Sequence, residues 1–213
     1  LARLEFQVLR FDPVGDADTK APFPGSSQAN EAITTVGFYL QDEIRLGKLG
    51  IIPGVRLDKH SLFDAVVSPK LGISYQLTGD TDLRTSVGRA YRAPSVTELF
   101  RPEWNLNPFI RLRPNPNLKP EYIWAVDAGL EHRFSPTLRV SLDGFYNSMQ
   151  DFIITQAVPG SPGIVQYQNL SDSWSGGAET TIEWRARDWL TLFANYTFLQ
   201  SNDKVNQVRI TNL

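Results

Sequence analysis

Arginine and aromatic side chains gather in one stretch of this sequence, from Arg89 to Glu121. Guanidinium groups bind carboxylates and phosphates through paired hydrogen bonds, and aromatic rings stack on flat ligand faces. The stretch therefore offers a binding site for an anionic ligand, with a solvated loop as the alternative interpretation. The residues that we single out as candidate ligand contacts are Arg89, Arg92, Arg101, Trp104, Arg111 and Arg113.

Prolines divide the same stretch, at positions 94, 102, 108, 114, 116 and 120. Because proline has no N–H donor and a fixed φ, this spacing predicts a long connection that contains neither a strand nor a long helix. A connection this long inside an ordered domain is uncommon, so it is either functional or evidence against the assignment of the flanking elements.

Other polar groups in the sequence suggest no catalytic or metal-binding constellation. Asp12, Asp16 and Asp18 lie in a glycine-containing segment at a spacing that suits oxygen ligands of calcium. The pattern is not that of an EF-hand, and a hydrated acidic loop is the simpler interpretation. His60 and His132 are isolated in the sequence and suggest neither a triad nor a metal site. We therefore expect no enzyme activity, no bound metal and no cofactor.

The composition limits the class of protein further. The chain has 213 residues, 41% of them hydrophobic, with a net charge of -2 and no cysteine. The near-neutral charge gives no sign of nucleic-acid binding, and the lack of cysteine removes disulfides, thiolate chemistry and zinc clusters. No run of eighteen apolar residues is present, so the sequence predicts no transmembrane helix. A membrane β-barrel is left open, because its strands alternate apolar and polar residues.

The elements that hold the arginine-rich stretch are predicted to be strands. Nine segments alternate apolar and polar residues with a period of two, and Asp42 and Pro53 interrupt the second and third. Within the second long connection, 149–174, the segments 152–155 and 165–169 are expected to form a hairpin above the sheet. The nine segments are approximately 3–11, 33–46, 49–58, 70–77, 83–88, 122–131, 138–147, 178–185 and 190–198.

Two regularities indicate how these strands are arranged. Long and short connections largely alternate, as in an antiparallel up-and-down meander with its short turns at one end. From the fourth strand onward, the apolar parity of the predicted strands carries no charged residue. A soluble sandwich shows similar alternation, but its strands average roughly 5–6 residues, whereas a bilayer requires about 9–11. The pattern therefore favours a transmembrane β-barrel over a soluble sandwich.

Six different motifs, in a fixed order along the chain, together resemble those of a known protein family. They are GFYLQDEIRL from Gly37, SPKLGISYQL from Ser68, RAYRAPSVTELF from Arg89, the run from Asn115 to Glu121, GFYNSMQDFI from Gly144 and YQNLSDSWSGGAETTIEWR from Tyr167. From about residue 36 to 201 the sequence resembles the C-terminal barrel half of TonB-dependent outer-membrane receptors. Arg92, Pro94 and Glu98 match a motif that recurs among receptors for different ligands, which favours a structural role for these three.

The resemblance implies a function in the bacterial outer membrane. Such receptors have a barrel of about twenty-two strands, plugged by an N-terminal domain, and take up ferric siderophores, haem, cobalamin or similar scarce solutes with energy delivered through TonB. The long loops would be extracellular and the short turns periplasmic. The implied partners are outer-membrane lipid and lipopolysaccharide, the protein's own plug, TonB and a small-molecule ligand such as a ferric siderophore, haem or cobalamin, of which we expect the ferric siderophore.

The sequence departs from the family by what it does not contain. No plug, no TonB box and no final strand ending in an aromatic residue are recognisable, so residues 1–213 are interpreted as a fragment of the barrel domain. Nine strands form an incomplete barrel, and we expect either a curved open sheet or one portion of a barrel whose remainder is not in this chain. Two alternatives remain: a passive pore or structural barrel of the outer membrane, and an extracellular all-β binding module.

Overall fold

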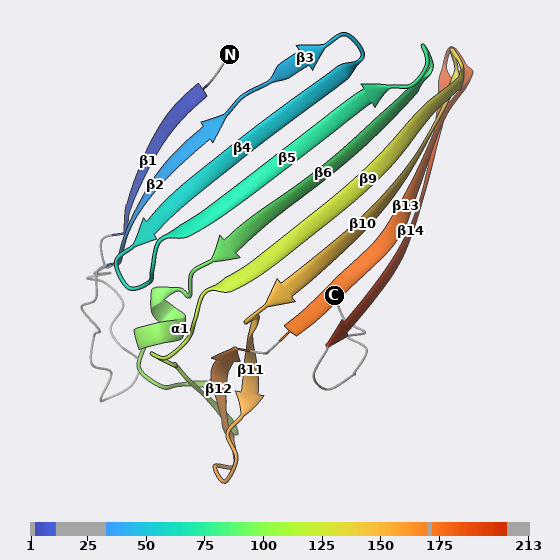
Figure 1. Cartoon of the computed structure of the whole chain (residues 1–213). Coiled ribbons are helices and arrows are strands. Elements are labelled where there is room, and N and C mark those ends of the chain that lie inside the picture. Colours follow the sequence, from blue (N-terminus) through green and yellow to red (C-terminus); the bar gives the residue numbers. More distant parts are fainter. Residues whose placement is uncertain (1–2, 12–32, 170–171, 204–213) are drawn as a thin grey trace.

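The computed structural model describes residues 3–11, 33–169 and 172–203. These residues form a large antiparallel sheet, a small four-stranded sheet and one short helix (Figure 1). The large sheet is a meander in which each of nine strands pairs with the next, and the short strand β3 (Ile44–Leu46) pairs with β4. The nine strands are β1 (Arg3–Phe11), β2 (Ile33–Gln41), β4 (Leu49–His60), β5 (Val66–Gln76), β6 (Thr81–Arg92), β9 (Glu121–Ser135), β10 (Leu138–Gln150), β13 (Asp172–Arg187) and β14 (Leu190–Asp203).

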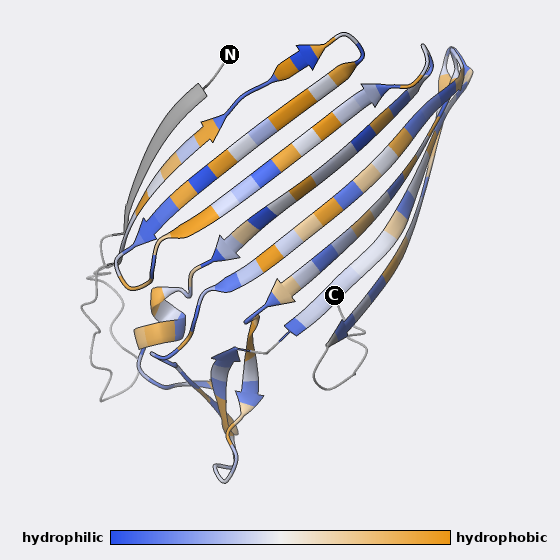
Figure 2. Ribbon diagram, in the orientation of Figure 1, coloured by the Kyte–Doolittle hydropathy of each residue, from blue (hydrophilic) through white to orange (hydrophobic). Residues whose placement is uncertain are grey.

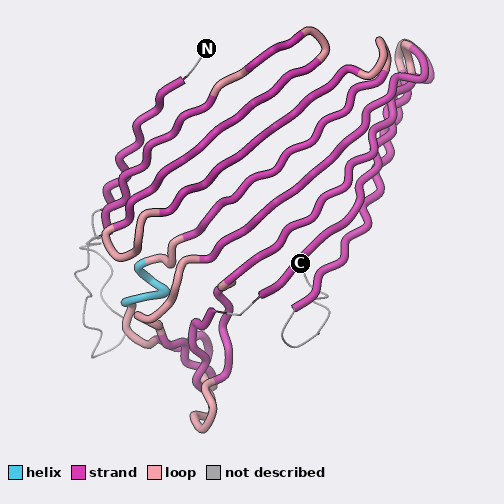
Figure 3. The backbone as a smooth tube through the Cα atoms, in the orientation of Figure 1, coloured by secondary structure: helices cyan, strands magenta, loops and turns pink. Residues whose placement is uncertain are grey.

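The predicted all-β meander is confirmed, and the sheet is curved and open. Strands β1 and β14 are its two edges, and they do not pair with each other (Figure 1). The backbone trace shows short turns at one end and the longer connections at the other (Figure 3). Most strands extend beyond the predicted segments, to 15 residues in β9 and 16 in β13. These lengths suit strands that cross a bilayer at a tilt.

The predicted second strand is interrupted rather than continuous. Strand β2 pairs with β4 as far as Gln41 and Gly54, and β3 resumes the pairing at Ile44 and Ile51. In the gap, the Asp42 backbone N–H donates to the Pro53 carbonyl at 3.1 Å. Proline has no N–H to donate to a neighbouring strand. The break between β2 and β3 lies opposite Pro53, where no such donor is available.

One face of the large sheet exposes large apolar side chains. Register pairs such as Leu83 with Leu130 and Val87 with Val126 place the apolar residues of neighbouring strands side by side. Leu142 is 54% exposed and Tyr196 is 69% exposed. The alternating stripes along the strands are visible in Figure 2. We call this surface the apolar outer face; a soluble sandwich would bury it.

The buried core of the described chain lies mostly outside the large sheet. Among the apolar side chains that are buried in the described residues, only Val66 belongs to a strand of that sheet. The others are in the long connections. No helix in the described ranges has the length and hydropathy of a membrane span. The buried residues are Val66, Leu99, Leu112, Leu118, Ile153 and Ile164.

The expectation that the proline-rich stretch contains no strand is wrong. After β6 come helix α1 (Val96–Phe100), strand β7 (Trp104–Asn107) and strand β8 (Ile110–Arg113). The prolines at 102, 108 and 114 lie between these elements and outside them, so none removes a ladder donor. Proline spacing therefore delimits two four-residue strands instead of preventing them.

The hairpin predicted in the second long connection is confirmed. Strands β11 (Ile153–Ala157) and β12 (Ile164–Asn169) pair antiparallel. Strand β12 also pairs in parallel with β8, so the small sheet has the order β11-β12-β8-β7. The two long connections, far apart in sequence, are therefore joined by backbone hydrogen bonds.

Candidate ligand-binding site

The two long connections leave the same end of the large sheet and meet there (Figure 1). We call residues 93–120 and 151–169 together the loop cluster. Its small apolar core consists of Leu99, Leu118 and Ile153, against which Phe63 and Tyr167 pack. The cluster thus has a core of its own above the sheet, which allows it to hold side chains in fixed positions.

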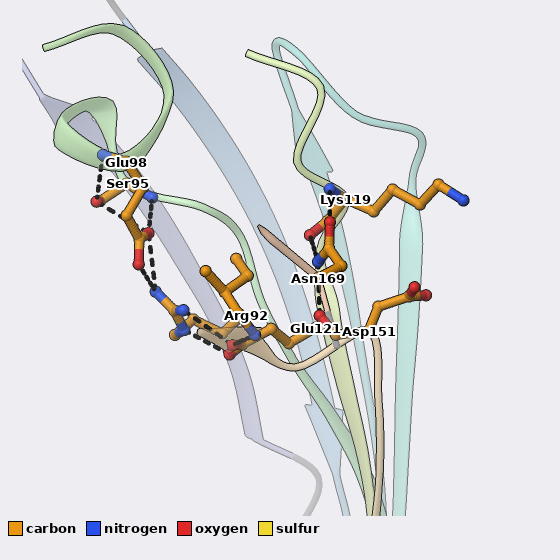
Figure 4. A network of polar contacts seen from close by, with 8 residues as sticks. Arg92, Ser95, Glu98, Lys119, Glu121, Asp151 and Asn169 are labelled. Carbon is orange, nitrogen blue, oxygen red and sulfur yellow. Dashed lines mark hydrogen bonds and ion pairs between the residues drawn. The ribbon is translucent and has the colours of Figure 1, made fainter. Parts of the chain in front are cut away.

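Arg92 anchors the loop cluster to the end of the large sheet (Figure 4). Its Nε and Nη2 donate to the two carboxylate oxygens of Glu121, at 2.5 and 2.9 Å, and its Nη1 donates to Glu98 at 3.1 Å. Only 8% of Glu121 is exposed, and its Oε1 also accepts the backbone N–H of Ile153. A charged carboxylate can be buried here because the guanidinium and a backbone amide satisfy it.

Helix α1 begins directly after this anchor. The Ser95 hydroxyl accepts the Glu98 backbone N–H, and the Glu98 carboxylate accepts the Ser95 backbone N–H at 2.7 Å, which is a capping box. Burial acts to raise the pKa of Glu98. The hydrogen bonds from Ser95 and Arg92 outweigh it, so the pKa lies below its usual range. Glu98 is therefore ionised at neutral pH and can hold Arg92.

Asparagines connect the two long connections to each other. The Asn169 side chain accepts the Lys119 N–H at 2.9 Å and donates to the carbonyls of Lys119 and Asp151 (Figure 4). The Asn115 amide donates to the Tyr167 carbonyl at 2.9 Å. These contacts satisfy backbone groups that form no ladder.

Arg101, Trp104, Arg111 and Arg113 lie together on the loop cluster. The Arg101 guanidinium stacks on the Trp104 ring with Cζ 4.4 Å from its centroid. Arg111 and Arg113 both bind Glu103, at 3.0 and 2.9 Å, and their side chains remain 55% and 38% exposed. Three arginines against one glutamate leave this surface positively charged. It presents the guanidinium groups and the aromatic ring that an anionic, ring-containing ligand requires.

The other two predicted contacts lie elsewhere. Arg92 is engaged by Glu98 and Glu121, in keeping with the structural role that its motif suggests. Arg89 pairs in register with Trp124 and shares the strand parity of Val87, so it belongs to the apolar outer face. The structure thus brings together four of the six candidates.

Sequence reasoning missed Glu103 and Tyr167 as members of this surface. The Tyr167 ring lies 6.4 Å from that of Trp104, across a chain separation that the parallel pairing of β12 with β8 bridges. For Glu103, the signal was present, since it lies between two candidate arginines in the sequence. Asp12, Asp16 and Asp18 lie outside the described residues.

The polar parity of the large sheet carries charged networks. Glu131 lies 3.5 Å from both Arg84 and Arg139, the Asp127 carboxylate accepts the Ser86 hydroxyl, and Arg56 binds the buried Asp58. In the part of the chain that the structure describes, no group of three or more potential metal ligands is found. These charged and polar side chains line the face opposite the apolar one, as expected for the lumen side of a barrel.

Comparison with known proteins yields a family match and many relatives. A family model for the β-barrel of TonB-dependent receptor-like proteins matches residues 2–212. The ferric enterobactin receptor of Pseudomonas aeruginosa is 28% identical over 190 residues, 78% of this chain and 25% of that protein. The vitamin B12 transporter BtuB of Vibrio vulnificus is 30% identical over 126 residues, 59% of this chain and 18% of that protein.

Solved structures agree in fold. The ferric enterobactin receptor PfeA in complex with BCV-L6 superposes with a TM-score of 0.72 at 23% identity, covering 86% of this chain and 30% of that one. The siderophore receptor PirA from Pseudomonas aeruginosa gives 0.68 at 24% identity, covering 80% and 32%. The chain spans less than a third of the length of these relatives and structures.

Proposed function

The chain belongs to the TonB-dependent receptor-like β-barrel family, and from that premise we propose that it forms wall and outer loops of an active transporter for a scarce solute. A chain of this family lies in the bacterial outer membrane, and its exposed apolar face suits that place. The solute class that we propose is a ferric siderophore. No covalent chemistry is part of this function; the loops bind the ligand and the barrel admits it.

The observation that carries this proposal is the positively charged, aromatic surface of the loop cluster. Arg101, Trp104, Arg111 and Arg113 are held by a small sheet and an apolar core above one end of the large sheet. Ferric catecholates are anionic and present flat rings, so guanidinium groups and an indole ring complement both properties. The relatives include receptors named for ferric enterobactin, which is a ligand of this kind.

The remaining partners follow from the same premise. We expect β1 and β14 to pair with further strands of one barrel, because an unpaired edge inside a bilayer leaves backbone groups unsatisfied. A plug domain would lie against the polar parity of the sheet, where Arg84, Glu131 and Arg139 are placed. Energy would reach the ligand through that plug and TonB. In this arrangement residues 1–213 are one portion of the barrel domain.

The test uses the full-length protein that carries this chain, with ferric enterobactin as the probe and tryptophan fluorescence quenching as the readout. Replacing Arg111 and Arg113 by glutamine is expected to weaken binding about tenfold or more, since two charge-assisted contacts are lost. Arg84→Gln combined with Arg139→Gln removes the same charge from the polar parity of the sheet and is expected to leave binding unchanged.

Other outcomes distinguish the alternatives. Binding of haem or cobalamin in place of the ferric catecholate would support the proposed transporter class but show that the proposed ligand is wrong. Open-channel conductance in planar bilayers, with uptake that is insensitive to collapse of the proton-motive force, would show a passive pore. A full-length protein that stays monomeric without detergent would instead support an extracellular binding module.

A further inference from the structure

Two cations lie on the apolar outer face, and the predicted strands did not contain them. Strand β4 continues past Asp58 to His60 and adds Lys59 to the parity of Val55 and Leu57. Strand β6 continues to Arg92 and adds Arg89 to the parity of Leu83 and Val87. Both additions lie at the end of the sheet where the long connections begin. A charge on the lipid-facing side of a barrel is tolerated there, close to the membrane interface, but is costly near the midplane.

Aromatic and apolar residues surround these cations. The Arg89 guanidinium stacks on the Tyr122 ring, with Cζ 4.4 Å from the centroid. Trp124, which is 43% exposed, pairs with Arg89 in register, and Val67 is 47% exposed beside them. Tyrosine and tryptophan concentrate at the level of lipid headgroups, where their rings meet both hydrocarbon and water. The surroundings of Arg89 are therefore those of a membrane interface.

A cavity of about 360 Å³ joins the two cations through Tyr122. Lys59 and Tyr122 both line it, together with Pro120 and the turn residues Ser61, Leu62, Phe63 and Asp64. Arg89 adjoins it, since its guanidinium covers the Tyr122 ring. The volume falls within the range of sites for small ligand groups, about 300–1,000 Å³.

Neither cation is neutralised by a carboxylate contact among the described residues. The Lys59 ammonium donates to the Phe63 carbonyl at 3.1 Å, and an Arg89 Nη1 donates to the Val67 carbonyl at 3.3 Å. Both contacts are to neutral oxygens, whereas most arginines of the sheet and loop cluster bind a carboxylate. Asp64 is the acidic residue that lines the cavity, so two positive charges face one negative charge.

We propose that Lys59, Arg89 and Tyr122 form a site for the phosphorylated headgroup of an outer-leaflet lipid. The ammonium and the guanidinium donate to phosphate oxygens, and Tyr122 and Trp124 pack against the sugar and upper acyl region. The occupant is a lipid and not a free anion because Lys59, Arg89 and Tyr122 lie on the parity of the apolar outer face, beside exposed side chains such as Leu57, Val67 and Trp124. This inference rests on the proposed membrane location, but it does not depend on the identity of the transported solute.

The experiment measures lipid binding to the delipidated full-length protein in detergent by native mass spectrometry. The probe is bis-phosphorylated lipid A, compared with the same lipid after both phosphates are removed. For the parent protein, we expect the phosphorylated form to bind at least about tenfold more tightly, because charge-assisted hydrogen bonds are lost with the phosphates. Its binding should weaken as the salt concentration rises, since charges at the interface are screened.

Three variants locate the site. Lys59→Gln combined with Arg89→Gln is expected to abolish the preference for the phosphorylated lipid. Lys70→Gln combined with Arg84→Gln removes the same charge from the adjacent strands β5 and β6 but on the polar parity, and should retain the preference. Asp64→Asn removes the opposing carboxylate and should strengthen binding severalfold, an effect that general loss of structure cannot produce.

The proposal is overturned by any of three results. The first is a Lys59 and Arg89 double variant that still prefers the phosphorylated lipid as strongly as the parent protein does. The second is a parent protein that binds both lipid forms equally. The third is displacement of the lipid by millimolar inorganic phosphate, which would show that the site binds a free anion. Ferric enterobactin binding by the same samples, measured separately, reports whether the proposed transport ligand holds, so the two hypotheses fail independently.

Discussion

At the scale of single residues, Arg92 decides how the strand passes into the loop cluster. One guanidinium binds the strand residue Glu121 and the helix residue Glu98 at once, and Glu121 in turn accepts a backbone N–H of the second long connection. Lysine cannot replace it, because an ammonium group has no planar fork to hold two carboxylates in fixed directions. Arg92 is thus a structural residue beside a binding surface, which its motif had suggested.

Arg92→Ala is expected to destabilise the loop cluster by about 1–3 kcal/mol, because the buried Glu121 loses its charged partner. Limited proteolysis of the full-length protein should show faster cleavage within 93–120, with the barrel intact. The matched control is Arg84→Ala. Arg84 lies 3.5 Å from its partner Glu131, and its side chain is 58% exposed. An exposed pair of this kind contributes less than about 1 kcal/mol. If Arg92→Ala and the parent protein resist proteolysis equally, the contacts of Arg92 are not needed to hold the loop cluster.

At the scale of elements, the small sheet makes one unit of two loops. The parallel pairing of β12 with β8 and the shared core of Leu99, Leu118 and Ile153 mean that neither connection can move without the other. The arginines on β8 therefore depend on the hairpin β11–β12 for their position. A mutation in the hairpin should change ligand binding even though no hairpin residue is a predicted contact.

Gly163 allows this junction to form. It has φ of +77°, and a Cβ at this position would lie 2.6 Å from the Phe109 carbonyl oxygen. Its own carbonyl accepts the Arg111 N–H at 2.8 Å, at the start of β8. Both the left-handed backbone and the close approach require glycine.

Gly163→Ala is expected to separate β12 from β8 and to weaken ferric enterobactin binding severalfold. Gly160→Ala is the control, because Gly160 has a similar φ of +73° but nothing within 4 Å of its Cβ position. Both variants carry the cost of a left-handed alanine, about 1–2 kcal/mol; only the first adds the backbone clash. Hydrogen exchange of the β8 and β12 amides, measured by mass spectrometry, should therefore rise in Gly163→Ala alone. The same exchange in both variants would remove the clash as the cause.

At the scale of the whole molecule, two faces of the sheet separate two solvents. Leu142 lies on the apolar outer face near the middle of β10, and Ser141 lies beside it on the polar parity, opposite Glu131 and Thr181. In a barrel wall the first faces hydrocarbon and the second faces the lumen.

Leu142→Arg should therefore lower the free energy of unfolding in lipid bilayers by about 2–4 kcal/mol. Ser141→Arg, one position earlier, should lower it by much less. Folding of the full-length protein into phosphatidylcholine vesicles, followed over a denaturant series, gives both values. Similar small effects of the two substitutions would argue that the outer face is not covered by lipid.

The local alternation of apolar and polar residues was sufficient to predict the antiparallel meander. Strand segments, the alternation of long and short connections and the apolar parity all depend on neighbouring residues and on a period of two, which the side chains display directly. The family motifs, each a short run of residues, were readable for the same reason. The misjudged places were local as well: proline positions marked the limits of β7 and β8, and Pro53 opposite Asp42 marked a break between β2 and β3.

The composition of the ligand surface depended on contacts between distant parts of the chain. Arg101, Trp104, Arg111 and Arg113 share a surface with Tyr167 because β12 lies parallel to β8, and no periodicity in either segment specifies a parallel partner some fifty residues away. The extension of β4 and β6 past their apolar segments also came from pairing with neighbours, which satisfies backbone groups whatever the side chains are. That extension moved Arg89 from the predicted ligand site to the outer face, beside Lys59 and Tyr122.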